Sequence, residues 1–203
     1  MQGIKNIVFD FGCVLVDLDK QACVEALNRI GANNVSSYVD ECRQEDLFHE
    51  LETGNISVGD FCNEVRRLCP DCHATDEQIC EAWNALLTGI PQQRLERLIS
   101  LKKDYRLLLL SNTNPIHWHK SVRDYFPHDG YEVDDYFEKT FLSYRMHLIK
   151  PDERIFREML IAAEMMPHET LFIDDSPMNC AAASELGINT ICVSHGDEWL
   201  DKI

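Results

Sequence analysis

The chain lacks the long apolar runs and the excess of basic side chains that mark membrane-spanning and nucleic-acid-binding proteins. None of its apolar runs approaches the about 18 consecutive residues that a membrane-spanning helix needs. Its 203 residues include 19 lysines and arginines against 35 aspartates and glutamates, which gives a net charge of −16 at pH 7. This balance leaves no basic surface to neutralise the phosphates of a nucleic acid or to bind an anionic membrane. A small anionic substrate then requires local positive charge, which a bound metal ion can supply.

The sequence also lacks a secretion signal and a cysteine pattern typical of disulfides. No signal-peptide pattern precedes the first apolar stretch, so we expect a cytoplasmic protein. The nine cysteines are odd in number, and in a reducing compartment they do not predict a disulfide framework. The string CPDCH at residues 69–73 matches a haem-attachment pattern, but covalent haem needs an exported chain. We therefore interpret the cysteines of this region as small apolar core residues. The sequence does not indicate the oligomeric state.

Short apolar runs, each bounded by polar or glycine residues, predict strands that are buried on both faces of a sheet. Helical patterns that begin at Pro91, Pro151 and Ser176 alternate with the later runs, and proline is favoured at the first position of a helix. This alternation predicts an α/β fold built on a doubly wound parallel sheet. The apolar runs are residues 7–9, 107–110, 171–173 and 191–193, with a weaker one at 140–142.

A long interval between the first and second apolar runs contains helical patterns and no convincing strand. Ser57 with Asp60 three residues later, and Thr75 before two acidic residues, are start signals for two of these helices. The interval is much longer than a crossover between strands needs, so we expect an inserted all-helical subdomain over residues 18–86. Residues 1–17 and 87–203 then form the α/β core. The expected helices cover residues 20–30, 43–51, 57–68 and 75–87.

Acidic and polar side chains stand directly after three of the predicted strands. Asp10 follows the first, Ser111 and Asn112 follow the second, and Asp174 and Asp175 follow the third. Because ligands of open α/β sheets bind outside the carboxyl ends of the strands, we expect these side chains to converge at one edge. Asp10 and Asp175 could hold Mg²⁺, a hard cation that takes one or two carboxylates. Such an ion would provide the positive charge that a phosphate group requires.

The same residue types are those that phosphoryl transfer uses. An aspartate at a strand end with glycine two residues later, as in Asp10 and Gly12, can expose its carboxylate and attack phosphorus. Ser111, helped by the amide of Asn112, could hydrogen-bond a phosphoryl oxygen. Lys150 stands in a loop directly before a helix and could place its charge against the phosphate and against Asp10. These residues are the candidates for a nucleophile, a phosphate-binding group and a neutralising cation.

Four segments of the chain resemble, in order and spacing, the four motifs of the haloacid dehalogenase superfamily. They are IVFDFGCVLVD, LLLLSNTN, LIKPDERIF and TLFIDDSPMN, which extend from Ile7 to Asn179. The first two are most similar to those of the family's sugar-phosphate phosphatases, such as phosphatases of α-glucose 1-phosphate. The resemblance implies a Rossmann-like core with a helical cap inserted after the first motif. It also implies Mg²⁺-dependent hydrolysis of a small phosphorylated metabolite.

The resemblance further implies a role for each matching residue. Asp10 would be the catalytic nucleophile that forms an aspartyl-phosphate, Ser111 would bind the phosphate, and Lys150 would neutralise charge. Asp174 would lie just outside the metal's own ligands or belong to an additional metal site. The ligands of Mg²⁺ would be Asp10, the backbone carbonyl of Gly12, and Asp175.

Three positions depart from the family pattern. The residue two after the nucleophile is commonly an aspartate that protonates the leaving group and then activates water, but here it is Gly12. Asn179 stands where many members have an acid, and His147 where many have glycine, which we expect to reshape the loop before Lys150.

The absence of an acid at Gly12 leaves the activity open to alternatives. General acid–base catalysis contributes about 10² to 10⁴ in rate, so another group substitutes, the leaving group is a good one, or turnover is slow. A phosphometabolite-binding protein with weak catalysis is one alternative. A sugar phosphomutase is another, although a mutase needs the missing acid even more. The candidate substitutes are Asp17, Asp19, His117 and His119.

Overall fold

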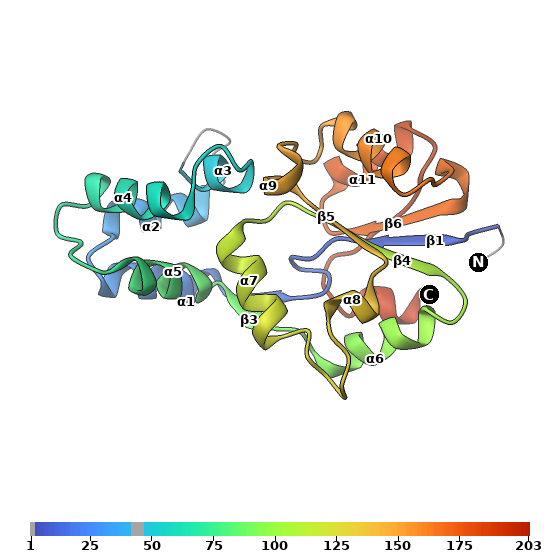
Figure 1. The fold of residues 1–203 in the computed structure, drawn as a ribbon, viewed down its shortest axis with the longest axis horizontal. Coiled ribbons are helices and arrows are strands. Elements are labelled where there is room, and N and C mark those ends of the chain that lie inside the picture. Colours follow the sequence, from blue (N-terminus) through green and yellow to red (C-terminus); the bar gives the residue numbers. More distant parts are fainter. Residues whose placement is uncertain (1–2, 42–46) are drawn as a thin grey trace.

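The computed structural model describes residues 3–41 and 47–203 and has a five-stranded parallel sheet at its centre (Figure 1). The strand order is β5-β4-β1-β6-β7, so the chain extends from β1 to one side of the sheet and returns to build the other. The order reverses between β1 and β6, which is where ligands bind in such sheets. The predicted doubly wound parallel sheet is confirmed. Its strands are β1 (Asn6–Phe9), β4 (Arg106–Ser111), β5 (Lys139–Leu142), β6 (Thr170–Asp174) and β7 (Asn189–Cys192).

Different helices cover the two faces of the sheet (Figure 1). Ile7 and Phe9 of β1 point into one apolar cluster, whereas Val8 between them points into the other, as the alternation of a strand requires. The first cluster includes residues of α6 (Gln92–Leu101), α7 (Pro115–Asp124), α8 (Val133–Tyr136) and the 3₁₀-helix Glu198–Asp201. The second includes residues of α10 (Glu153–Ala162) and α11 (Pro177–Glu185). Two short helices, α9 (Ser143–Met146) and the 3₁₀-helix Pro167–Glu169, lie in connections.

The helix starts agree with the predictions in one case and differ in two. Ser176 caps α11 and Pro177 is its first residue, as predicted. Pro91 is the cap residue of α6 and not its first helical residue. Pro151 lies before α10, because the carboxylate of Asp152 accepts a hydrogen bond from the N–H of Arg154 and takes the cap position.

The interval between β1 and the second core strand is mostly helical, as predicted, but the helix predicted over residues 75–87 ends at Asn84, and Leu87 begins the short strand β3 (Leu87–Gly89). Its helices share a third apolar cluster, which includes Leu27, Phe61, Ile79 and Trp83 and is joined by Ile116 of α7. The helix α2 was not predicted, because its polar residues give little local signal for a helix. It is stabilised instead by its apolar side chains, which pack into this cluster. The predicted helix 43–51 is seen as α3, and residues 43–46 lie outside the described residues. The helices are α1 (Lys20–Arg29), α2 (Asn33–Glu41), α3 (Leu47–Glu52), α4 (Val58–Leu68) and α5 (Asp76–Asn84).

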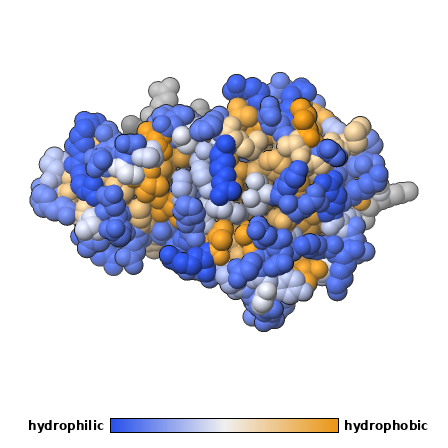
Figure 2. Space-filling view, in the orientation of Figure 1, coloured by the Kyte–Doolittle hydropathy of each residue, from blue (hydrophilic) through white to orange (hydrophobic). Residues whose placement is uncertain are grey.

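A short antiparallel ribbon joins the helical segment to the sheet. It pairs β2 (Asp17–Leu18) with β3 (Leu87–Gly89), so the chain enters and leaves the segment through neighbouring strands. The side chains of Ser57 and Thr75 cap α4 and α5, which confirms both start signals. Hydrophilic residues cover most of the face seen in Figure 2. Among the described residues, no helix has the length and apolar character needed to cross a membrane.

Candidate active site

The carboxyl ends of β1, β4 and β6 bring the predicted site residues together. β1 lies between the other two strands and pairs with both, so Asp10, Ser111 and Asp174 emerge at one edge of the sheet. One carboxylate oxygen from each of Asp10, Asp174 and Asp175 lies within 4.8 Å of the others. The expected convergence of these acids is therefore present in the fold.

Lys150 is buried among these carboxylates. Its Nζ donates hydrogen bonds to Asp10 Oδ1 and Asp174 Oδ2, both at 2.6 Å, and to the main-chain oxygen of Leu110 at 3.1 Å. Burial opposes the charge of the ammonium group, but the two carboxylates outweigh it and raise the pKa of Lys150. The lysine is therefore held as a fixed cation beside Asp10.

Asn112 holds the main chain of Lys150 in place. Its Oδ1 accepts a hydrogen bond from the Lys150 N–H at 2.9 Å, and its Nδ2 donates to the Lys150 carbonyl at 3.0 Å. The side-chain amide thus positions the lysine, a role that no pattern in the sequence indicated. Because the carboxamide is engaged in this way, it is not free for the predicted phosphate contact of Asn112.

Asp174 is fully buried and held from several directions. Its Oδ1 accepts hydrogen bonds from the N–H of Ser176 at 2.8 Å and from Nδ2 of Asn179 at 3.0 Å, while Lys150 binds its Oδ2. Asn179, noted in the sequence only as a departure from the family pattern, therefore acts as a donor to this carboxylate. A second acid in its place would bring another negative charge against Asp174.

The carboxylates outnumber the cation at the site. Burial raises the pKa of Asp10 to about 7, against the opposing effect of Lys150 and with a further contribution from Asp174. Burial also raises the pKa of Asp175, which is half-buried. When ionised, the three carboxylates facing one ammonium leave two negative charges in excess. A cluster of carboxylate oxygens with this excess has the donor chemistry and charge that fit Mg²⁺.

Ser111 presents a buried hydroxyl that has no partner among the residues that the structure describes. Its Oγ makes no hydrogen bond to any described residue, although the side chain is 1% exposed. Buried polar atoms in native proteins almost always have a hydrogen-bond partner, so an orphan at a strand end beside a carboxylate cluster indicates a ligand-binding group.

The turn after Asp10 has room for a side chain at Gly12. A Cβ added to this glycine would meet only Leu18 Cδ1, at an ordinary contact distance of 3.7 Å, and its φ lies outside the left-handed region. The absence of an acid here is therefore not imposed by the backbone.

The four candidate substitutes for that acid are engaged elsewhere or exposed. Asp17 Oδ1 accepts a hydrogen bond from Arg94, and Asp19 Oδ1 caps α1 by accepting from the N–H of Ala22. His117 Nε2 contacts the carbonyl of Trp83 at 3.1 Å, and burial lowers its pKa to about 4. His119 is exposed on α7.

The chain is similar to a family of hydrolases and to a named phosphatase. The family model described as haloacid dehalogenase-like hydrolase matches residues 92–193. The D-ribitol-5-phosphate phosphatase of Bacteroides thetaiotaomicron is 34% identical over 200 residues, which make up 98% of this chain and 97% of that protein.

Solved structures are similar over the same extent. A HAD family enzyme from Bacteroides thetaiotaomicron, in complex with magnesium and inorganic phosphate, has a TM-score of 0.94 at 39% identity and covers 98% of this chain and 99% of its own. A HAD-like family hydrolase from Porphyromonas gingivalis has a TM-score of 0.90 at 37% identity, with 98% of this chain and 95% of its own covered.

Proposed function

The chain belongs to the haloacid dehalogenase-like hydrolase family, and we propose that it is a magnesium-dependent phosphatase acting on a small phosphomonoester. The resemblance carried by the four sequence motifs is thereby confirmed. The observation that carries the proposal is the meeting, at one sheet edge, of Asp10, the buried Lys150 and the unpartnered hydroxyl of Ser111. A nucleophilic carboxylate, a cation and a hydroxyl donor are the groups that phosphoryl transfer to an aspartate requires.

Mg²⁺ would be held by Asp10, Asp175 and the backbone carbonyl of Gly12. Asp174 would lie behind them, because Lys150 and Asn179 already bind both of its oxygens. The bound ion would supply positive charge to the phosphoryl oxygens as charge develops on them. With all three carboxylates ionised, the excess of two negative charges at the site supports a divalent ion over a monovalent one.

The chain's own residues then divide the reaction between them. A carboxylate oxygen of Asp10 forms a bond to phosphorus while the bond from phosphorus to the ester oxygen breaks, and the ester oxygen leaves with a proton from water. Ser111 Oγ donates to a phosphoryl oxygen, and Lys150 orients Asp10 and favours its ionised form. Water then attacks the phosphorus of the aspartyl-phosphate, which releases inorganic phosphate and restores the Asp10 carboxylate.

We also propose that residues 18–86 form a cap over a core of residues 1–17 and 87–203. The antiparallel ribbon at both boundaries and the separate apolar cluster of the helices support this division. A cap that closes over the site would exclude water and contact the rest of the substrate. The substrate class we propose is a sugar phosphate or a related metabolite, and the relative named a D-ribitol-5-phosphate phosphatase supports it.

The proposal is tested by measuring phosphate release from a panel of sugar phosphates, with Mg²⁺ or with a chelator. We expect turnover by the wild type with Mg²⁺, loss of turnover with the chelator, and loss in Asp10→Asn. Asp134→Asn, which changes an exposed aspartate in the same way, is the matched control and should be as active as the wild type. Turnover that survives the chelator, or that survives Asp10→Asn, would refute the mechanism.

Gly12 favours one other candidate, a phosphometabolite-binding protein that has lost turnover. The two are separated by titration calorimetry of the same panel alongside the phosphate assay. Tight binding of a phosphorylated metabolite without phosphate release would establish the binding protein and exclude the phosphatase.

A further inference from the structure

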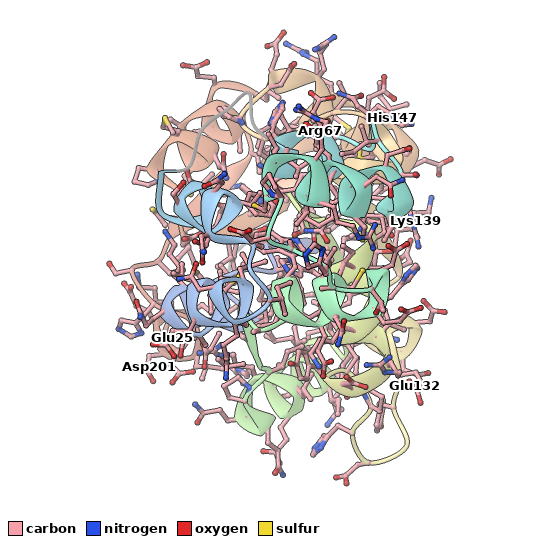
Figure 3. The ribbon with its side chains drawn as sticks, turned by 90° about the vertical axis from the view of Figure 1, so that its left-hand side faces the viewer. Glu25, Arg67, Glu132, Lys139, His147 and Asp201 are labelled. Atoms are coloured by element: carbon pink, nitrogen blue, oxygen red, sulfur yellow. The ribbon has the colours of Figure 1, made fainter. Side chains whose placement is uncertain are left out.

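The helical segment touches the core at its connecting ribbon, at α7, where Trp83 packs against His117, and at α9. The carbonyl of Glu52, the last residue of α3, accepts a hydrogen bond from Ser143 Oγ at 2.6 Å. The next carbonyl, that of Thr53, lies 3.0 Å from Nδ1 of His147, which is the donor in this contact. Figure 1 shows α3 and α9 side by side, and Figure 3 places His147 against the helical segment.

The backbones themselves are in close contact beside these bonds. Gly54 has a φ of +70°, and a Cβ added to it would overlap the main-chain oxygen of Tyr144. His147 also adopts the left-handed conformation, with a φ of 54°, and so ends α9 while directing its imidazole to Thr53. The contact therefore depends on a glycine on the cap side and on a histidine at a position where many relatives have glycine.

The Ser143 hydroxyl faces a second partner on the core side. It accepts a hydrogen bond from the N–H of Thr113 at 2.9 Å, and it lies 2.9 Å from the carbonyl of the same residue. A hydroxyl has only one proton to donate, so the carbonyls of Glu52 and Thr113 compete for it. The shorter distance favours Glu52 while the cap is docked, and the proton is free to turn to Thr113 when the cap withdraws.

Ser111, at the end of β4, and Lys150 both lie within three residues of a group in this contact. Thr113 lies two residues after Ser111, and His147 lies three residues before Lys150. We propose that Ser143 is a positioning residue, which transmits docking of the helical segment to the end of β4, where Ser111 stands. This inference rests on the proposed phosphatase function, because the role of Ser143 is to make phosphatase turnover depend on a closed cap.

The first test is the kinetic effect of Ser143→Ala on hydrolysis of a sugar phosphate by the full chain with Mg²⁺. Loss of one hydrogen-bonding group that aligns a transition-state donor should lower kcat by about five- to tenfold and leave KM nearly unchanged. Ser121→Ala is the matched control, because Ser121 is equally buried and its hydroxyl bonds only the carbonyl of His117 within its own helix. Melting temperatures of both variants show whether a loss of folding contributes.

The second test separates transmission from a local structural role. Gly54→Ala should break the contact between α3 and α9 through the overlap with Tyr144, and it should lower kcat by a similar factor. Gly130→Ala is the control, because Gly130 has a φ of +82° but no heavy atom within 4 Å of an added Cβ, so it has the same backbone strain without the overlap. If docking acts through Ser143, adding Ser143→Ala to Gly54→Ala should lower kcat less than twofold further.

A third readout does not need activity. Hydrogen exchange of the Thr113 amide, which donates to Ser143 Oγ, should become faster in Ser143→Ala, which removes this acceptor, and in Gly54→Ala, where loss of the α3–α9 contact loosens Ser143, but not in Gly130→Ala. The inference would be overturned if the two reductions of kcat multiplied in the double variant. It would also be overturned if the exchange rate of the Thr113 amide were unchanged in Gly54→Ala. A wild-type protein that releases no phosphate would instead overturn the proposed function, and the exchange measurement would still test the coupling.

Discussion

Replacing Gly12 by aspartate should give the site the proton donor that it lacks. The backbone at Gly12 accepts a side chain, because the only heavy atom near an added Cβ is Leu18 Cδ1 at 3.7 Å. Residue 12 stands two positions after Asp10, in the turn that leads from the sheet edge. We therefore expect Gly12→Asp to fold with an unchanged melting temperature and to place a carboxyl group beside the leaving oxygen.

The size of the gain depends on how much the leaving group needs a proton. General acid catalysis contributes about 10² to 10⁴ in rate, which corresponds to about 3 to 5 kcal/mol of transition-state free energy. A sugar alkoxide is a poor leaving group and should benefit by this factor. A nitrophenolate leaves without protonation, so its phosphate ester should benefit very little.

The assay compares kcat/KM for a sugar phosphate and for p-nitrophenyl phosphate in the wild type, Gly12→Asp and Gly12→Asn. This ratio of constants reports the steps up to cleavage of the ester bond, before the aspartyl-phosphate is hydrolysed. We expect only Gly12→Asp to raise kcat/KM for the sugar phosphate relative to kcat/KM for the aryl phosphate. If Gly12→Asp folds but its ratio of kcat/KM for the two substrates is unchanged, another group already donates the proton. The interpretation that the site lacks a proton donor would then be wrong.

Three further results are expected from single changes. Asn112→Ala should lower kcat by about tenfold or more in the phosphate assay, because it removes both hydrogen bonds that hold the main chain of Lys150; unchanged kcat would deny Asn112 that role. Burial lowers the pKa of His117 to about 4 from its ordinary 6.5. Between these two pH values the folded protein binds fewer protons than the unfolded protein does. The contribution of His117 to stability is therefore full above pH 6.5 and falls as the pH decreases toward 4. Denaturant unfolding should show a loss of up to about 3 kcal/mol from pH 7 to pH 4, and His117→Gln should flatten this dependence; an equally steep curve in the variant would assign the loss to other groups. Ser57→Ala should lower the free energy of unfolding by about 1 kcal/mol in the same assay, since it removes the capping box that Ser57 forms with Asp60; no change would mean that the α4 cap adds no stability.

The strands and the residues at their ends could be predicted because both depend on neighbours in the chain. A short apolar run such as 107–110 is buried wherever a parallel sheet forms, and the residue that follows it must emerge at the carboxyl edge. The sequence alone therefore predicts that Asp10, Ser111 and Asp174 lie at one edge of the sheet. The interval of helices was predicted for the same reason, since caps such as Ser57 with Asp60 are local patterns.

The partners of the polar side chains could not be predicted in this way. Asn112 is a candidate for a phosphate contact in the sequence, but its side chain meets the main chain of Lys150, 38 residues away. Asn179 departs from the family pattern, and only the packing of α11 against β6 makes it a donor to Asp174. α2 carries a weak local signal and is helical because Val35 and Val39 have a cluster to enter.

By itself, the sequence determined the parallel sheet, the helical interval and the order in which acids, hydroxyl and lysine reach the sheet edge. Tertiary structure alone decided that Lys150 lies between Asp10 and Asp174, and that Ser143 meets Glu52 across 91 residues of chain. The physical reason is that burial patterns repeat with the period of a helix or strand and can be read locally. A hydrogen bond instead joins whichever groups the packed elements bring within about 3 Å, and that depends on the whole fold.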